Sequence, residues 1–147
     1  ETMIMSRTDS RAVYGIDDAI ERTKRYIDAG AEICFADGIG TREELEKFAK
    51  ELSGSGAYLV ANMIEGGKTP LIPAKELEQM GFSLVFWACS AVYTISKALY
   101  DLFGNLAQDG TTEKSLDRMI EFSQFNSMIG LDTYKEYERK YKVDRDD

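Results

Sequence analysis

Four short apolar segments, spaced 25 to 29 residues apart, constrain the fold of this chain more than any other feature of its sequence. Each segment is followed by a stretch whose apolar residues recur at helical spacing. Strands that alternate with helices pair in parallel through right-handed crossover connections. The sequence therefore predicts an α/β fold with a parallel sheet. The predicted strands cover residues 3–6, 32–36, 58–63 and 82–88.

The predicted helices divide the chain into two parts. Residues 1–110 form four βα units, and residues 111–147 form a C-terminal helical extension. In the second unit, Thr41 and Glu44 have the spacing of a capping box, which would begin a helix at residue 41. The predicted helices cover residues 16–29, 41–52, 74–80, 91–108, 114–122 and 132–141. We expect the apolar side of the helix at 91–108 to be buried, including Ile95, Leu99 and Leu106.

Composition excludes several classes of function. Hydrophobic residues make up 44% of the chain and charged residues 30%, which is typical of a globular protein. The net charge of −8 argues against nucleic acid as a partner and against a membrane-surface helix. The longest apolar run, residues 84–89, is too short to span a membrane. The chain has no histidine. Its own residues therefore cannot form a histidine-containing zinc site or use histidine in catalysis.

Two observations lead us to expect that this chain is the second half of something longer. A closed barrel of parallel strands needs eight βα units, and four units leave two sheet edges unpaired. The first predicted strand also begins at residue 3, and residue 1 is not methionine. The two cysteines, Cys34 and Cys89, lie in apolar segments without a CxxC spacing, which favours a reduced, cytoplasmic protein.

Polar residues gather directly after the third predicted strand. Ligands of α/β proteins bind beyond the carboxyl ends of the strands, and this end carries Asn62, Glu65 and Lys68 within a glycine-rich loop. Arg7 and Asp37 follow the first and second strands. We interpret Lys68 chiefly as a solvated loop charge that could attract anions.

Five sequence motifs follow one another along the chain. They are residues 4–12 (IMSRTDSRA), 15–22 (GIDDAIER), 26–31 (YIDAGA), 61–70 (ANMIEGGKTP) and 76–82 (ELEQMGF). In their order and spacing they resemble the isocitrate lyase/phosphoenolpyruvate mutase superfamily. The tail, from residue 125 to residue 141, resembles that of the smaller superfamily members.

The resemblance implies a (β/α)8 TIM barrel, of which this chain supplies strands five to eight. It also implies that the eighth helix is exchanged between subunits, in dimers that pair into tetramers, and the helices after Gly110 are the candidates for that exchange. The substrate would be a small carboxylate bound as a Mg²⁺ chelate. The metal-binding aspartates of the family lie on early strands, so we expect the Mg²⁺ ligands upstream of this chain and none within it.

The resemblance also implies roles for individual residues. Arg7 would be catalytic and hold the substrate carboxylate, because a guanidinium clamps carboxylates and offsets enolate charge. Its structural alternative is an ion pair with Asp9 or Asp37. Asn62 would donate a hydrogen bond to the substrate, or else cap a turn. Asp37 stands where carbon–carbon lyases often carry glutamate, and this shorter acid departs from that pattern. Glu65 would line the mouth of the site or order its loop.

The resulting hypothesis is the C-terminal half of a Mg²⁺-dependent carbon–carbon lyase. Its substrate would be a substituted malate or a methylisocitrate-like 2-hydroxy acid, cleaved through an enolate. A phosphonomutase and an oxaloacetate decarboxylase are the enzymatic alternatives. The alternative from another class is a catalytically inert half-barrel.

Overall fold

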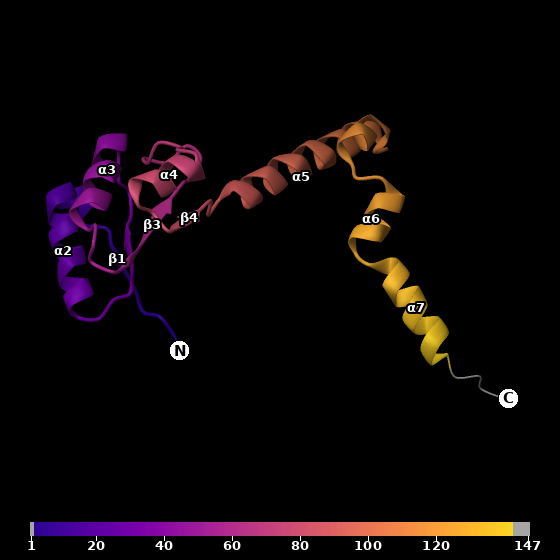
Figure 1. The fold of residues 1–147 in the computed structure, drawn as a ribbon. Coiled ribbons are helices and arrows are strands. Elements are labelled where there is room, and N and C mark those ends of the chain that lie inside the picture. Colours follow the sequence, from indigo (N-terminus) through magenta and orange to yellow (C-terminus); the bar gives the residue numbers. More distant parts are fainter. Residues whose placement is uncertain (1, 143–147) are drawn as a thin grey trace. The chain divides into compact units, whose positions relative to one another are not determined.

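Residues 2–142 are described by a computed structural model, in which strands and helices alternate (Figure 1). The strands are β1 (Met5–Thr8), β2 (Ile33–Ala36), β3 (Tyr58–Asn62) and β4 (Leu84–Phe86). The helices among and after them are α1 (Arg11–Tyr14), α2 (Ile16–Asp28), α3 (Arg42–Glu51), α4 (Ala74–Met80) and α5 (Ser90–Asp109). The C-terminal elements are the 3-10 helix η1 (Glu113–Arg118), α6 (Phe122–Met128) and α7 (Leu131–Tyr141).

The strands form one parallel sheet in the order β1-β2-β3-β4, as the repeat predicts. Strand β1 lies two residues later than the predicted segment at 3–6. Its register explains this difference, because Met5 pairs with Ile33 and Thr8 pairs with Ala36. The position of β1 is therefore set by its partner strand, and all four carboxyl ends lie at the same edge of the sheet.

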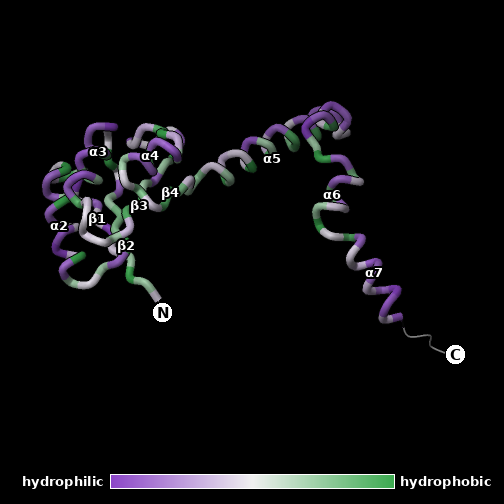
Figure 2. The backbone as a smooth tube through the Cα atoms, viewed as in Figure 1, coloured by the Kyte–Doolittle hydropathy of each residue, from purple (hydrophilic) through white to green (hydrophobic). Residues whose placement is uncertain are grey.

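One face of the sheet is covered by helices. Cys34, Leu59 and Ala61 point to this face and are at most 4% exposed. They share a core with residues of α2, α3 and α4, and Phe48 of α3 is fully buried in it. Burial of one such aromatic side chain stabilises the fold by about 1.5–3 kcal/mol. Figure 2 shows the middle of β3 as hydrophobic and much of α2 as hydrophilic, as expected for a strand beneath an amphipathic helix.

The opposite face of the sheet carries the strand residues that alternate in sequence with the core residues. Successive strand residues point to opposite faces, so Arg7, Phe35 and Asn62 share the face that α2, α3 and α4 do not cover. The rings of Phe35 and Phe86 meet edge to face across β3, with 6.1 Å between their centroids. The guanidinium of Arg7 lies over the Phe35 ring, 5.1 Å from its centroid.

The C-terminal part differs from its predicted form. The chain divides into two compact units, one ending at Ser96 and one beginning at Lys97, within α5. No residue of α5 is buried in the described chain, and Ile95 is 56% exposed, so the expected burial of its apolar side is wrong. The apolar spacing of α5 predicts a helix face that packs against another element. Within residues 2–142, no element buries this face.

The helix predicted at 114–122 is also wrong. A 3-10 helix occupies Glu113–Arg118, and α6 begins only at Phe122. Within residues 2–142, no helix is both long enough and apolar enough to cross a membrane.

Candidate active site

Arg7 is the centre of a polar network at the carboxyl end of the sheet. Its Nε donates to Asp9 Oδ2 (3.0 Å), and its Nη2 donates to Asp9 Oδ1 (2.7 Å) and Asp37 Oδ2 (2.8 Å). Both ion pairs that the sequence offers as alternatives are therefore present. No described residue accepts from Nη1, so two of the five guanidinium N–H groups stay available to a ligand.

Asn62 extends this network to the third strand. Its Nδ2 donates to Asp37 Oδ1 (3.2 Å), so Asp37 bridges Arg7 and Asn62. The Oδ1 atom of Asn62 is buried and has no hydrogen-bond partner within residues 2–142. An unsatisfied buried acceptor costs about 1–3 kcal/mol, so a donor that reaches this atom would be bound favourably.

The charges of the network stabilise one another. The hydrogen bond to Asp9 raises the pKa of Arg7, and the same bond lowers the pKa of the Asp9 carboxyl. Arg7 therefore stays cationic and Asp9 stays anionic at neutral pH. The two carboxylates fix the orientation of the guanidinium, which leaves its Nη1 edge turned away from them.

A second ion pair fixes the neighbouring loops. Arg11 Nη2 and Nε donate to Glu44 Oε2 (2.7 and 3.0 Å), and the same oxygen accepts from the Gly40 backbone N–H (2.8 Å). Burial alone would raise the pKa of Glu44, but the hydrogen bonds from Arg11 and Gly40 lower it. This pair ties the segment after β1 to the start of α3 and so supports the loop that carries Asp37.

The capping box predicted at Thr41 and Glu44 is formed in part. The Glu44 backbone N–H donates to Thr41 Oγ1 (3.2 Å), as expected. The Glu44 carboxylate accepts hydrogen bonds from the Gly40 N–H and from the Arg11 guanidinium. This contact of Arg11 could not be predicted from local sequence, because its partner lies 33 residues away.

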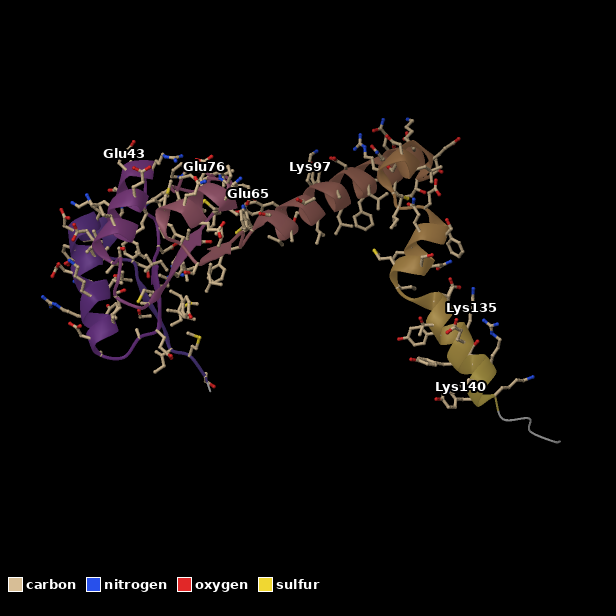
Figure 3. All side chains as sticks on the ribbon, viewed as in Figure 1. Glu43, Glu65, Glu76, Lys97, Lys135 and Lys140 are labelled. Carbon is tan, nitrogen blue, oxygen red and sulfur yellow. The ribbon has the colours of Figure 1, made fainter. Side chains whose placement is uncertain are left out.

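Glu65 takes part in a different contact. It lies where the loop after β3 meets the start of α5, and its Oε1 accepts from Ser90 Oγ (Figure 3). This hydrogen bond lowers the pKa of the Glu65 carboxyl. Its other oxygen, Oε2, is buried without a partner among the described residues. The structure therefore joins Arg7, Asp37 and Asn62 directly, whereas Glu65 anchors the loop.

A hollow of about 260 Å³ lies against this network. Asp9, Asp37 and Asn62 line it from the strand ends, and Lys68 and Thr69 line it from the loop after β3. Its lining combines these charged and polar side chains with the apolar Ala12 and Ile64, and its size suits a small carboxylic acid. From the sequence, Asp9 was expected only as an ion-pair partner of Arg7, and Lys68 chiefly as a solvated loop charge that could attract anions.

Residues 2–142 do not form a metal centre by themselves. No three Asp, Glu, Cys or His side chains converge in this part of the chain. Asp9 and Asp37, the two carboxylates at the hollow, are already engaged by Arg7. They do not fit the demands of Mg²⁺, which binds several oxygen ligands in an octahedron. No catalytic step is therefore assigned to a metal held by these residues.

Comparison of the sequence with known protein families identifies the family of this chain. The family model of phosphoenolpyruvate phosphomutase matches residues 1–107. The chain belongs to this family. The resemblance to the isocitrate lyase/phosphoenolpyruvate mutase superfamily is thereby confirmed.

Curated relatives of this phosphoenolpyruvate phosphomutase family chain include lyases and a mutase. It is 40% identical to 2,3-dimethylmalate lyase of Eubacterium barkeri over 97% of its own length and 48% of the relative. It is 39% identical to the chloroplastic carboxyvinyl-carboxyphosphonate phosphorylmutase of Arabidopsis thaliana, over 94% of its own length and 41% of the relative. The chain spans about half the length of the curated relatives it matches.

A solved structure agrees with the sequence relationship. The crystal structure of 2,3-dimethylmalate lyase superposes with a TM-score of 0.80 at 29% identity, covering 94% of this family member and 47% of that chain. The parallel sheet and its helices therefore match part of an enzyme of the same superfamily.

Proposed function

We propose that the protein is a carbon–carbon lyase that cleaves a substituted malate or a methylisocitrate-like 2-hydroxy acid. The observation that carries this proposal is the free Nη1 edge of Arg7, held at the strand ends by Asp9 and Asp37. Nη1 carries two N–H groups, and each can donate a charge-assisted hydrogen bond to a carboxylate oxygen. The kinship with 2,3-dimethylmalate lyase supports the same class of substrate.

The chemistry requires stabilisation of an enolate. Removal of the proton of the substrate's 2-hydroxyl by a base turns that carbon into a carbonyl and breaks its bond to the next carbon. The electron pair of the broken bond passes into the adjoining carboxylate. Arg7 would hold this carboxylate and offset the charge that develops on it, which is a favourable use of a fixed cation. The base would come from outside this chain.

The unsatisfied oxygen of Asn62 favours a hydroxy acid over the phosphonomutase alternative. Oδ1 accepts hydrogen bonds and cannot donate them, so it suits a ligand that carries a hydroxyl group. Enolpyruvate phosphates and phosphonopyruvates have no 2-hydroxyl to donate. Decarboxylation of oxaloacetate, whose keto form also lacks this donor, is less well matched for the same reason.

We further propose that β1–β4 are one half of an eight-stranded barrel in a cytoplasmic homo-oligomer. The 47% coverage of 2,3-dimethylmalate lyase supports the half-barrel. Mg²⁺ would be held by residues elsewhere in the complete protein and would supply charge neutralisation. The exposed apolar residues of α5, among them Leu99 and Phe103, suit a helix exchanged between subunits.

An assay of the protein at its full encoded length tests the proposal. Purified protein with Mg²⁺ is incubated with 2,3-dimethylmalate, 2-methylisocitrate, oxaloacetate or phosphonopyruvate, and products are identified by NMR. We expect cleavage of a hydroxy acid that EDTA abolishes, and we expect Arg7→Ala to lower kcat/KM by about 10²-fold or more. Arg22→Ala, at an ion-paired arginine of α2, is the control and should leave kcat/KM unchanged. Rearrangement of phosphonopyruvate alone, or an active Arg7→Ala variant, would contradict the proposal.

A further inference from the structure

Lys68 is a cation at the hollow that the proposed chemistry does not yet use. Within residues 2–142, it is the one lysine or arginine that lines the hollow. No described carboxylate pairs with it, because Asp9 and Asp37 are both engaged by Arg7. Its ammonium group is therefore available to an anion that enters the hollow.

The loop that carries Lys68 has a defined conformation. Gly66 has a φ of 72°, a left-handed value that favours glycine, and the Gly67 N–H donates to the Ile64 carbonyl (3.0 Å). At Gly67, an added Cβ would lie 3.0 Å from that same carbonyl oxygen. The chain therefore turns tightly just before Lys68.

Contacts on both sides of this turn hold the loop against the sheet. Before the turn, Glu65 accepts a hydrogen bond from Ser90 at the start of α5. After it, Ile72 is 6% exposed, and its N–H donates to Met63 Sδ (3.4 Å). A loop anchored at both ends keeps the backbone of Lys68 beside the hollow, so its position is a property of the fold.

The charges at the hollow indicate which ligands such a lysine would select. Arg7 neutralises only one of the two negative charges of Asp9 and Asp37, so a ligand with two carboxylates would meet a net negative wall. Arg7 does not line the hollow itself, but it is bonded to Asp9 and Asp37, which do, and its free Nη1 offers one carboxylate a place to bind next to the hollow. A second carboxylate needs another cation, and Lys68, in the loop after β3, is the cation that lines the hollow within residues 2–142.

We propose that Lys68 is a specificity-determining residue that binds the second carboxylate of the substrate and so selects dicarboxylates over monocarboxylates. This proposal rests on the proposed function, because it takes the same hollow as the substrate site. A monocarboxylate requires one cation, and the fixed guanidinium of Arg7 supplies it through Nη1. Loss of Lys68 should therefore weaken dicarboxylate binding selectively.

The test compares malate with lactate, which carries the same hydroxyl but one carboxylate. Dissociation constants are measured by calorimetry on the protein at its full encoded length with Mg²⁺, for wild type, Lys68→Gln and Lys68→Arg. We expect Lys68→Gln to weaken malate about 10-fold, as one ion pair of about 1.4 kcal/mol would, and to leave lactate within about twofold. Lys68→Arg should retain malate. Lys75→Gln, an exposed lysine of α4 that does not line this hollow, is the matched control and should match wild type.

Each remaining outcome has a distinct meaning. Unchanged malate binding by Lys68→Gln would overturn the role of Lys68 and leave the proposed function intact. Equal weakening of malate and lactate would also overturn it, because the effect would then lie in the loop as a whole. Wild-type protein that binds neither acid would contradict the proposed function itself, and the role of Lys68 with it.

Discussion

The two faces of the parallel sheet have similar apolar character, but large apolar residues are exposed on only one of them. On the face under α2, α3 and α4, Leu59 is 4% exposed. On the other face, Val60 is 1% exposed, but Leu84 is 39% exposed and Tyr58 is 51% exposed. Strands with apolar residues on both faces are typical of sheets that are buried on both sides. The difference indicates that the second face, which also carries Arg7 and Asn62, is built to be covered.

The largest effect expected is on stability, from matched leucines on the two faces. In the protein at its full encoded length, Leu59→Ala should lower the free energy of unfolding by about 2–5 kcal/mol, because it opens a cavity in the core. If a second half of a barrel covers the other face, Leu84→Ala should cost at least about 2 kcal/mol as well. Urea denaturation measures both values. A cost below about 1 kcal/mol for Leu84→Ala would mean that this face stays open to water.

A smaller effect is expected at Gly40, beside the site. A Cβ at this position would lie 2.4 Å from Arg11 Nη2, so the guanidinium must move and leave Glu44. We expect Gly40→Ala to lower the free energy of unfolding by about 1.5–3 kcal/mol, the value of a hydrogen bond to a charged group. Gly104→Ala is the matched control in α5, where a Cβ meets nothing within 4 Å. It should raise stability by about 0.5–1 kcal/mol. A neutral Gly40→Ala would show that the Arg11–Glu44 pair is dispensable.

The smallest effect expected is a pH dependence of the same pair. Because the folded state lowers the pKa of Glu44, its contribution to stability is present above the ordinary glutamate pKa of about 4.3 and is lost as the pH falls through the folded value. The stability difference between wild type and Glu44→Gln, measured by urea denaturation from pH 7 to pH 3, should therefore shrink below about pH 4. A difference that is constant over this range would contradict the assigned pKa direction.

Local signals in the sequence were sufficient for much of the fold. The apolar run at 58–63, bounded by glycines, predicts β3 within one residue of its end. The start of β1 depends on its pairing with Ile33, and the exposure of α5 depends on which elements surround it. Tertiary pairing of this kind has no signature within a single segment of sequence, so these predictions failed.

The meeting of Arg7, Asp37 and Asn62 at one edge of the sheet was predictable, but the hydrogen bonds that join the site to its loops were not. Arg7, Asp37 and Asn62 follow successive strands, and parallel pairing brings them to one edge, where they are bonded to one another. The contact of Glu65 with Ser90 and the support of Gly40 by Arg11 and Glu44 join loops that are far apart in sequence. Only the folded arrangement shows that Arg7 has one edge bound and one edge free.

A crystal structure of the full-length protein with Mg²⁺ and oxalate, an enolate mimic, tests this central claim most directly. We expect a carboxylate of oxalate within about 3.2 Å of Arg7 Nη1, a normal hydrogen-bond distance. Nε and Nη2 should stay on Asp9 and Asp37, as they are now. Oxalate bound at another edge of the sheet, or at this edge with Nη1 unengaged, would contradict the account.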